Sequence, residues 1–259
     1  MKKVSSFGII LMCLMGAVLS SCGDDESDDS PKTISIIPSS VNLYYEETQQ
    51  LSASGATSWS SENDFVAEVD SKGLVTANHV GSTNILASNG NVKGKCTVTV
   101  KPKYNCYDTP LLNWGASKNA ISAAETHTKG SSSSSNHLYY QYTNGTTVAV
   151  VQYVFENNAL KGINVIAPSS DYASIGLHLL ERYQPIGKDD DSNFYFIDSM
   201  DLKLARNVLS LSLTTISSSN YTLVTYIKNN ASSNAPRRAI SHNMEVPNEV
   251  LSILKNEQR

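Results

Sequence analysis

Apolar and polar residues alternate in short runs over residues 32–101, and Gly, Asn and Ser separate the runs. Successive side chains of a strand point to opposite faces of a sheet, so this period of two predicts strands with one buried face. About seven short strands at this spacing predict an all-β sandwich. The expected strands are Thr33–Ile37, Val41–Tyr45, Gln50–Ala53, Val66–Val69, Leu74–Ala77, Thr83–Ala87 and Cys96–Val100.

Beyond Pro102 the pattern changes, and residues 104–230 combine helical and strand periods. Short helices are expected at residues 113–124 and at Tyr172–Tyr183, each followed by strands rich in apolar and aromatic residues. One helix followed by three strands therefore occurs twice, which predicts an α+β two-layer domain on an antiparallel sheet, with an internal duplication. The expected strands are Leu138–Tyr142, Thr147–Phe155, Leu160–Ile166, Asn193–Ile197, Val208–Ile216 and Tyr221–Ile227.

The N-terminus has the three zones of a secretory signal peptide, which we assign to residues 1–21. Lys2 and Lys3 precede an uncharged apolar run from residue 7 to residue 19, and Ser20 and Ser21 follow it. This run is too short for a transmembrane helix, which needs about 20 apolar residues. Because a secretory signal directs export, we expect the rest of the chain to lie outside the cytoplasm.

The sequence Leu19-Ser20-Ser21-Cys22 resembles the lipobox of bacterial lipoproteins. The resemblance implies cleavage before Cys22 and a diacylglyceryl group on its thiol, so that lipid would hold the chain to a membrane. The alternative is an ordinary secreted protein in which Cys22 pairs in a disulfide.

Residues 22–31 are expected to form a disordered linker. Five acidic residues lie between Gly23 and Ser30 without an apolar side chain, so the stretch repels itself and has nothing to bury. It resembles the acidic stretch after the lipidated cysteine of surface-exposed lipoproteins in Bacteroides-type bacteria, and a plain spacer is the alternative. The resemblance implies an outer-membrane lipoprotein exposed at the cell surface.

Several motifs within residues 32–101 occur in the order found in the bacterial Ig-like domain of group 2, and the stretch resembles that family. The resemblance implies a spacer or an adhesion module of a cell-surface protein. Trp59 is expected in the core, and residues 70–73 are expected to form a turn that needs Gly73. The motifs are Ile36-Ile37-Pro38, Gln50-Leu51, Trp59-Ser60-Ser61, Val66-Ala67, Gly73-Leu74-Val75-Thr76-Ala77 and Val98-Thr99-Val100.

Residues 104–230 carry a looser resemblance. The start Trp-Gly-Ala-Ser at residues 114–117, and a strand that runs Tyr-Val-Phe-Glu-Asn-Asn-Ala-Leu at residues 153–160, resemble the doubled repeat of β-lactamase-inhibitor-like and outer-membrane-assembly lipoprotein folds. The resemblance implies the fold of the domain and nothing of its activity.

Charge and cysteine content narrow the class of protein. The chain has 20 Lys and Arg against 24 Asp and Glu, and the leader removes two lysines, so the mature net charge is 18 − 24 = −6. A mildly acidic chain without a basic stripe is a poor nucleic-acid binder, so the charge excludes a typical protein of that class. Cys96 lies in phase with apolar residues of its strand, which favours a buried free thiol over a disulfide between Cys96 and Cys106.

Candidate chemistry is sparse. The sequence has no Gly-x-Ser-x-Gly motif, so we assign no nucleophile and no other catalytic residue. We also assign no cofactor and no metal ligand. Asp189 to Asp191 offer oxygen ligands for Ca²⁺, but they lack the spacing of an EF-hand, and a solvated turn is favoured. The five histidines stand in different segments without the i, i+4 spacing of a helical zinc site: His79, His127, His137, His178 and His242.

Two further patterns concern glycans. Asp198-Ser199-Met200 resembles the short O-glycosylation motif of exported proteins in Bacteroides-type bacteria. A group of tyrosines could stack on sugar rings, but alternation sends about half of them inward, and core packing is the favoured role. These tyrosines are Tyr139, Tyr140, Tyr142, Tyr153 and Tyr195.

The last segment, residues 231–259, is expected to be a tail with one amphipathic helix from about Pro247. The whole pattern favours a non-enzymatic surface lipoprotein, whose Ig-like spacer presents a C-terminal domain to a glycan, a host molecule or an envelope protein. The alternative is a periplasm-facing accessory or inhibitor-like lipoprotein of an envelope complex, and a hydrolase is third. The sequence determines neither the ligand nor the oligomeric state.

Overall fold

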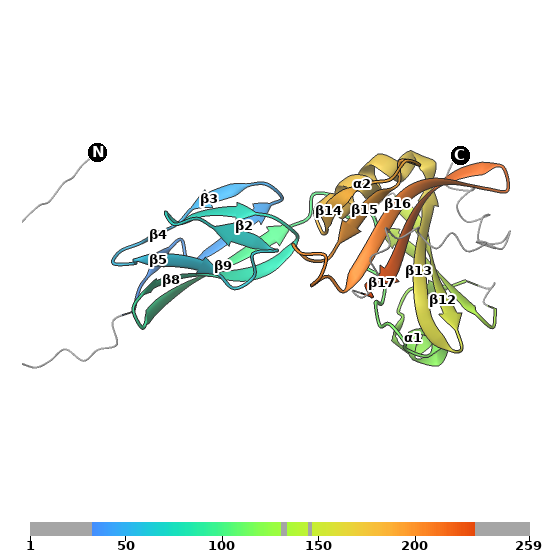
Figure 1. Ribbon diagram of the computed structural model, residues 1–259, viewed down its shortest axis with the longest axis horizontal. Coiled ribbons are helices and arrows are strands. Elements are labelled where there is room, and N and C mark those ends of the chain that lie inside the picture. Colours follow the sequence, from blue (N-terminus) through green and yellow to red (C-terminus); the bar gives the residue numbers. More distant parts are fainter. Residues whose placement is uncertain (1–32, 131–133, 145–146, 231–259) are drawn as a thin grey trace, which may run out of the picture. The chain divides into compact units, whose positions relative to one another are not determined.

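The computed structural model describes residues 33–130, 134–144 and 147–230 (Figure 1). All described residues belong to one compact unit, which begins at Thr33. The expected signal peptide, Cys22, the acidic linker and the tail at 231–259 lie outside the described residues. Within the described part of the chain, no helix combines the length and the hydropathy that crossing a bilayer requires.

Residues 36–101 form a β-sandwich, as the sequence predicts. A four-stranded sheet has the order β2-β9-β8-β5 with β2 and β9 parallel, and a three-stranded sheet has the order β3-β7-β6, while β1 pairs with β4. The inward side chains of these sheets meet in one apolar core. The strands are β1 Ile36–Ile37, β2 Ser40–Tyr44, β3 Thr48–Gln50, β4 Ser52–Ala53, β5 Ser58–Ser61, β6 Ala67–Val69, β7 Leu74–Ala77, β8 Gly81–Asn89 and β9 Val92–Lys101.

Each of the seven predicted strands overlaps a strand of the sandwich, but β5 was missed. Its sequence Ser-Trp-Ser-Ser has a single apolar residue, so it carries no alternation. The side chain of Trp59 is only partly buried and packs against the edge of the core. The predicted turn at residues 70–73 is confirmed: Asp70 accepts hydrogen bonds from the backbone of Lys72 and Leu74, and Gly73 has φ +82°.

Residues 118–228 contain one eight-stranded antiparallel sheet with the order β10-β11-β12-β13-β17-β16-β15-β14. The first four strands follow α1 and the last four follow α2, and the two sets meet where β13 pairs with β17. A helix followed by strands thus occurs twice along the chain. The elements are α1 Lys118–Ala124, β10 Thr128–Lys129, β11 His137–Asn144, β12 Thr147–Glu156, β13 Ala159–Pro168, η1 Ser169–Asp171, α2 Tyr172–Leu180, β14 Gln184–Lys188, β15 Phe194–Ile197, β16 Asn207–Ile216 and β17 Ser219–Lys228.

The description of this region as α+β is not confirmed, because strands predominate and the two α-helices are short. The helix expected at residues 113–124 begins only at Lys118, where Ser117 caps it by accepting from the backbone of Ala120. Gly115 has φ +83°, which a helix does not allow. The short edge strands β10 and β14 were also missed, since two residues and a Pro-Ile-Gly segment show no strand pattern.

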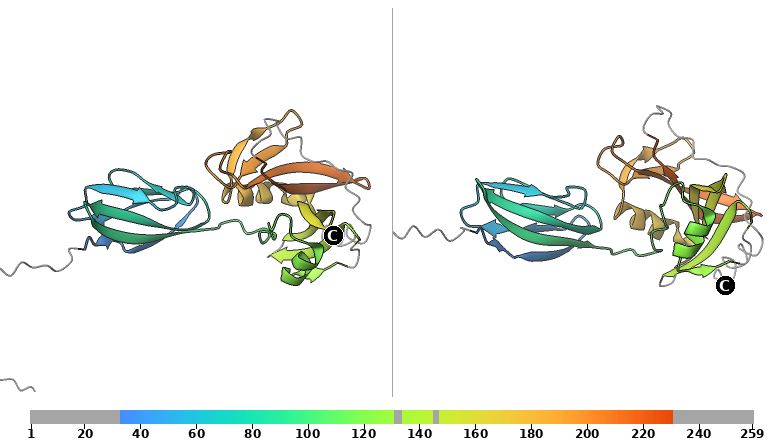
Figure 2. Two further views of the ribbon diagram at one scale, coloured as in Figure 1. Left: turned by 60° about the horizontal axis from the view of Figure 1, so that its bottom comes forward. Right: turned by 90° about the horizontal axis from the view of Figure 1, so that it is seen from below.

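Both helices pack on the same face of the sheet, which we call the first face. Ile121 of α1 and Ile175 and Leu179 of α2 belong to a single core cluster with the inward side chains of the strands. Figure 2 shows α1 in green against the strands of the first half of the sheet. The opposite face, which we call the second face, carries the alternate side chains of the same strands.

Candidate functional site

The cysteines of the described residues have structural positions. Cys96 and Cys106 are both free and buried, as the strand pattern predicts for Cys96. Burial raises the pKa of each thiol, which keeps it protonated and unreactive near neutral pH. Neither thiol is therefore a candidate nucleophile.

In the acidic loop at residues 188–193, the carboxylate of Asp189 accepts hydrogen bonds from the loop and from the following strand. Asp189 accepts hydrogen bonds from the backbone of Asp191 and Asn193, from the Asn193 side chain and from the Tyr195 hydroxyl, at 2.8–3.1 Å. These hydrogen bonds lower the pKa of Asp189. Among the described residues, no group of three or more His, Cys, Asp and Glu side chains could hold a metal ion.

The tyrosines considered for sugar stacking lie mainly inside the domain. Tyr139, Tyr140, Tyr142 and Tyr153 are all buried, so their rings present no flat face to a ligand. Tyr195 is half-buried and donates to Asp189. Core packing, the favoured role, is confirmed for the first four.

Among the described residues, Glu125 and His127 form the closest association of an acid with a histidine, at the end of α1. The Glu125 side chain is 2 % exposed and accepts from Tyr142 at 2.6 Å, Tyr153 at 2.5 Å and His127 Nδ1 at 2.6 Å. Burial would raise the pKa of Glu125, but hydrogen bonds from the two tyrosines and His127 outweigh it and lower the pKa. Burial also raises the pKa of both tyrosines. The hydroxyls thus remain protonated donors, and the cluster joins α1 to β11 and β12.

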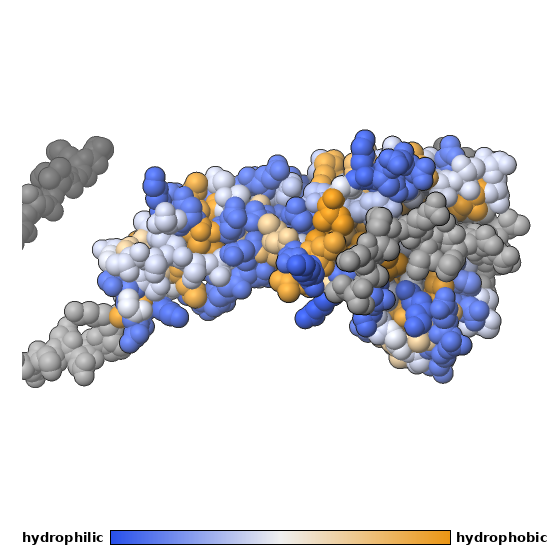
Figure 3. Space-filling model, in the orientation of Figure 1, coloured by the Kyte–Doolittle hydropathy of each residue, from blue (hydrophilic) through white to orange (hydrophobic). Residues whose placement is uncertain are grey.

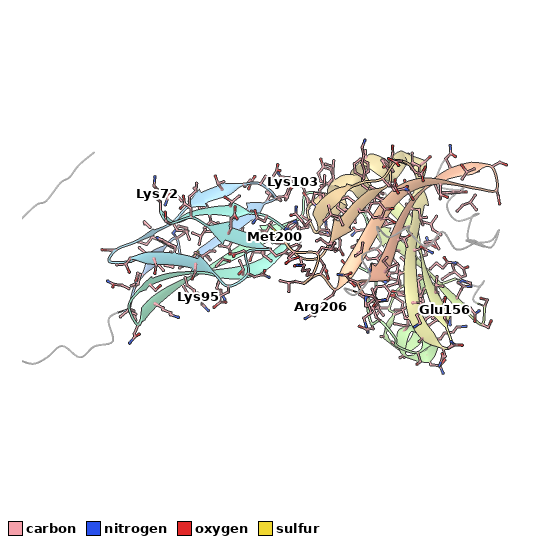
Figure 4. The ribbon with its side chains drawn as sticks, in the orientation of Figure 1. Lys72, Lys95, Lys103, Glu156, Met200 and Arg206 are labelled. Atoms are coloured by element: carbon pink, nitrogen blue, oxygen red, sulfur yellow. The ribbon has the colours of Figure 1, made fainter. Side chains whose placement is uncertain are left out.

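The most distinctive surface feature is the loop between β15 and β16, residues 198–206. It exposes three apolar side chains in alternation: Met200 is 55 % exposed, Leu202 40 % and Leu204 74 %. Lys203 and Arg206 are exposed beside them. Figure 4 labels Met200 and Arg206, and Figure 3 shows hydrophobic side chains next to hydrophilic ones in this part of the surface.

Hydrogen bonds within the 198–206 loop fix its shape. Asp198 accepts from the backbone of Arg206 at 2.8 Å and of Asn207 at 3.0 Å, which closes the loop at its base. Asp201 accepts from the backbone of Lys203 at 2.8 Å, and its carbonyl accepts from the backbone of Leu204 at 3.0 Å. The two carboxylates are therefore structural, and their positions make the loop rigid.

The base of the loop is buried. Ala205 packs in a small cluster with Ile197 and Val208, so the chain turns inward just after Leu204. Asn207 accepts a hydrogen bond from the Trp114 indole at 2.6 Å and thereby connects the loop to the segment before α1. The loop thus exposes three apolar side chains to solvent, and its buried base fixes their position.

Exposed apolar side chains on a rigid support are typical of protein interfaces, where Met and Arg are enriched. The sequence carried a signal for this site, the alternation Met200-x-Leu202-x-Leu204 between Asp198 and Arg206. The sequence prediction did not include this site, because such an alternation is also typical of an ordinary half-buried strand. In the structure Ser199 accepts from the backbone of Asp201 within the loop.

Comparison with known families identifies one region of the chain. Residues 30–100 match the model of the bacterial Ig-like domain (group 2). No curated protein matches the chain. The match thus supports the resemblance drawn from the motifs at residues 32–101.

Solved structures give distant likenesses. A mutant intimin of EHEC O157:H7 is 19 % identical over 46 % of this chain and 81 % of its own, with a TM-score of 0.22. Domains 5–6 of the S-layer protein SbsC are 14 % identical over 78 % of this chain and 86 % of their own, with a TM-score of 0.24. TM-scores of this size establish no common arrangement of the whole chain.

Proposed function

Because residues 30–100 form a group 2 bacterial Ig-like domain, we propose that this chain is a non-enzymatic lipoprotein of the bacterial surface. In this proposal the Ig-like domain is a spacer, and residues 104–230 form the domain that binds a partner. The lipobox-like Leu19-Ser20-Ser21-Cys22 supports attachment through lipid on Cys22 at the outer membrane. The acidic residues that follow support exposure at the cell surface.

The observation that carries the binding role is the 198–206 loop. Three exposed apolar side chains lose water-accessible area when a partner covers them, and each contributes roughly 1 to 2 kcal/mol to association. The loop is rigid, so little conformational entropy is lost on binding. Exposed Lys203 and Arg206 beside the apolar trio favour a protein partner with an apolar pocket and an acidic rim.

A protein partner is favoured over a glycan by the state of the tyrosines. Sugar binding relies on exposed aromatic faces and on polar groups that point toward the ligand, whereas Tyr139, Tyr140, Tyr142 and Tyr153 are buried.

The proposal that the chain is not an enzyme rests on the hydrogen bonds of its associated acid and histidine. Glu125 accepts hydrogen bonds from His127 and from two protonated tyrosines, and the other ring nitrogen of His127 lies 3.4 Å from Asp108, so these groups bind one another.

The alternative function is a periplasm-facing accessory or inhibitor-like lipoprotein of an envelope complex. It requires the same lipid anchor and the same exposed loop, and it differs only in the side of the membrane. Protease added to intact cells distinguishes the two proposals. The surface lipoprotein should be cleaved while a periplasmic marker stays intact, and protection of the chain until the outer membrane is permeabilised would favour the alternative.

The anchor and the loop are tested separately. Cys22→Ala should abolish incorporation of labelled palmitate and release the chain from the membrane fraction, and unchanged labelling would refute the lipid anchor.

For the loop, Met200→Ser, Leu202→Ser and Leu204→Ser are combined and screened on protein and glycan arrays. Leu213→Ser is the matched control, because Leu213 is 59 % exposed on β16. Binding that only the triple variant loses would place the contact in the loop.

A further inference from the structure

The hairpin of β14 and β15, residues 184–197, exposes apolar side chains beside acidic ones. β14 lies at one edge of the eight-stranded sheet, where β15 is its partner among the described strands (Figure 1). Ile186 of β14 is 45 % exposed, and Phe194 of β15 is 41 % exposed. The turn between the two strands carries Asp190 and Asp191, and both are exposed. The hairpin thus combines apolar side chains with an acidic rim.

The exposed acids of this turn are not used by the fold. Among the residues that the structure describes, neither Asp190 nor Asp191 forms a salt bridge, and the carboxylate of Asp189 is the one that binds the turn together. Lys188 is the single base of residues 188–193, so their net charge is 1 − 3 = −2. Two carboxylates therefore remain available to a basic partner.

The 198–206 loop carries the complementary charges. Lys203 and Arg206 are exposed beside its three apolar side chains, and neither base forms a salt bridge with any described residue. The acids of the loop, Asp198 and Asp201, accept hydrogen bonds from backbone N–H groups of the same segment. The loop thus offers apolar side chains and unpaired bases where the hairpin offers apolar side chains and unpaired acids.

The two surfaces cannot meet within one copy of the chain. The turn with the acids precedes β15, and the 198–206 loop follows it. β15 has four residues and is therefore roughly 13 Å long. Its pairing with β14 and β16 holds it extended, so the two surfaces stay at opposite ends of one strand. Only another molecule can bring the complement to either surface.

We infer that the 198–206 loop binds the β14–β15 hairpin of a second copy of this chain. The inference rests on the proposed function, because it names the partner of the same loop. The apolar side chains of the loop cover Ile186 and Phe194 of the other copy, and the bases of the loop approach the acids of the hairpin. Since each copy carries both surfaces, two copies related by a two-fold axis make both contacts at once.

The size of the two surfaces indicates a weak dimer. A stable interface buries about 800 Å² on each partner and involves roughly 20 to 30 residues a side. The loop and the hairpin together expose five large apolar side chains per copy, so the contact is at the low end of this range. Confinement to a membrane by the proposed lipid anchor raises the effective concentration of the copies and favours the dimer.

Charge reversal tests the contact, measured by sedimentation equilibrium of the full chain in mild detergent over a range of concentrations. One variant combines Lys203→Asp with Arg206→Asp, and the other combines Asp190→Lys with Asp191→Lys. Each variant alone should dimerise at least roughly tenfold more weakly than the native chain, because like charges then face each other. An equal mixture of the two should recover the native affinity to within about threefold, because each reversed surface meets its reversed complement.

The control separates this contact from attraction between net charges. Lys72→Asp and Lys95→Asp combined change the net charge as the loop variant does, but they lie at exposed positions of the sandwich (Figure 4). This variant should dimerise like the native chain. Mixed with the hairpin variant it should not recover the affinity, because the native loop then faces a basic hairpin. Recovery in this mixture would contradict the inference.

Photo-crosslinking locates the contact independently. Leu204→p-benzoylphenylalanine lies at a 74 % exposed position, so the fold is preserved. In a mixture with isotopically labelled native chain, it should link to a labelled peptide from residues 184–197. Leu74→p-benzoylphenylalanine, at a 37 % exposed position of β7, is the control and should give no such link. Links from residue 204 only within its own copy, or only to other segments, would overturn the inference.

Sedimentation of the native chain distinguishes failure of the inference from failure of the proposed function. A chain that stays monomeric at every concentration overturns the inference. If the triple serine variant of the loop nevertheless loses binding to another protein on the array, the proposed function stands with a different partner. If the native chain neither dimerises nor binds any protein through the loop, both are refuted.

Discussion

The side-chain amide of Asn229 donates a hydrogen bond of 2.8 Å to the carbonyl of Leu202. The same nitrogen donates to the carbonyl of Ala205, also at 2.8 Å, and the backbone of Asn229 donates to Arg206. The residue just beyond β17 therefore holds the 198–206 loop at three points. The exposed apolar side chains depend on a buried amide that is distant in the sequence.

Asn229→Ala is expected to loosen the 198–206 loop. The change leaves the carbonyls of Leu202 and Ala205 without their donor, at a cost of about 1 to 3 kcal/mol in the free energy of unfolding. Amide hydrogen exchange within the loop should accelerate more than exchange in β12 and β13. Asn42→Ala on an exposed position of β2 is the control. Uniformly faster exchange in all strands would mean that Asn229 supports the whole domain and not the loop.

Gly73→Ala tests the contact between the turn at residues 70–73 and Trp59. A Cβ at Gly73 would lie 2.8 Å from the Trp59 ring and 2.9 Å from the Leu51 carbonyl, and φ is +82°. Strain and overlap should together lower the free energy of unfolding by about 3 kcal/mol. Gly90→Ala has φ +58° and no atom within 4 Å, so it measures the backbone cost alone, about 1 kcal/mol. Equal losses in thermal or urea unfolding would show that the Trp59 contact is unimportant.

Glu125→Gln should destabilise the domain. The hydroxyls of Tyr142 and Tyr153 donate to Glu125 Oε2, and the backbone N–H groups of Thr126 and His127 donate to Oε1. The NH₂ group of Gln therefore meets hydrogen-bond donors in either orientation of the amide and cannot accept from them. Leaving buried donors unpaired should reduce the free energy of unfolding by about 2 to 4 kcal/mol. Glu156→Gln, at an exposed position of β12, is the matched control and should change it by less than about 0.5 kcal/mol. Urea unfolding of both variants at pH 7 measures the difference.

His178 predicts loss of stability in acid. Burial, followed by the charge of Arg182, lowers the pKa of His178 to about 3, against an ordinary value near 6.5. Between these values the unfolded chain binds one proton more than the folded chain, so the free energy of unfolding falls as the pH decreases. The slope from this residue approaches about 1.4 kcal/mol per pH unit and vanishes above pH 6.5.

The measurement is urea unfolding at pH 7 and pH 5 for the native chain and for His178→Phe. The variant removes the titrating group and keeps a ring of similar shape, so the difference between the two pH values should shrink by about 1 to 2 kcal/mol. An unchanged difference would show that other groups cause the sensitivity to acid, and His79, whose pKa burial also lowers, is the first candidate.

The sequence by itself determined the local features of this protein. The alternation in residues 32–101 predicted the sandwich, because one buried face per strand requires a period of two. Asp70 and Gly73 determined their turn, because their hydrogen bonds and φ are properties of neighbouring residues. The pattern of residues 104–230 located both helices and six of the eight strands. It overstated α1, whose beginning depends on the cap at Ser117 and the φ of Gly115.

Only the tertiary structure decided which distant residues meet. Pairing of β13 with β17 joins the two halves into one sheet, and nothing in either strand specifies that partner. The inward direction of Tyr142 and Tyr153 follows from their shared acceptor Glu125, which lies in another segment. The 198–206 loop is rigid because Asn229 and Trp114 reach its base. The periodicity of a sequence indicates whether a side chain is buried. Which residues bury it depends on the order of the strands, because contacts across a sheet leave no local signal in the sequence.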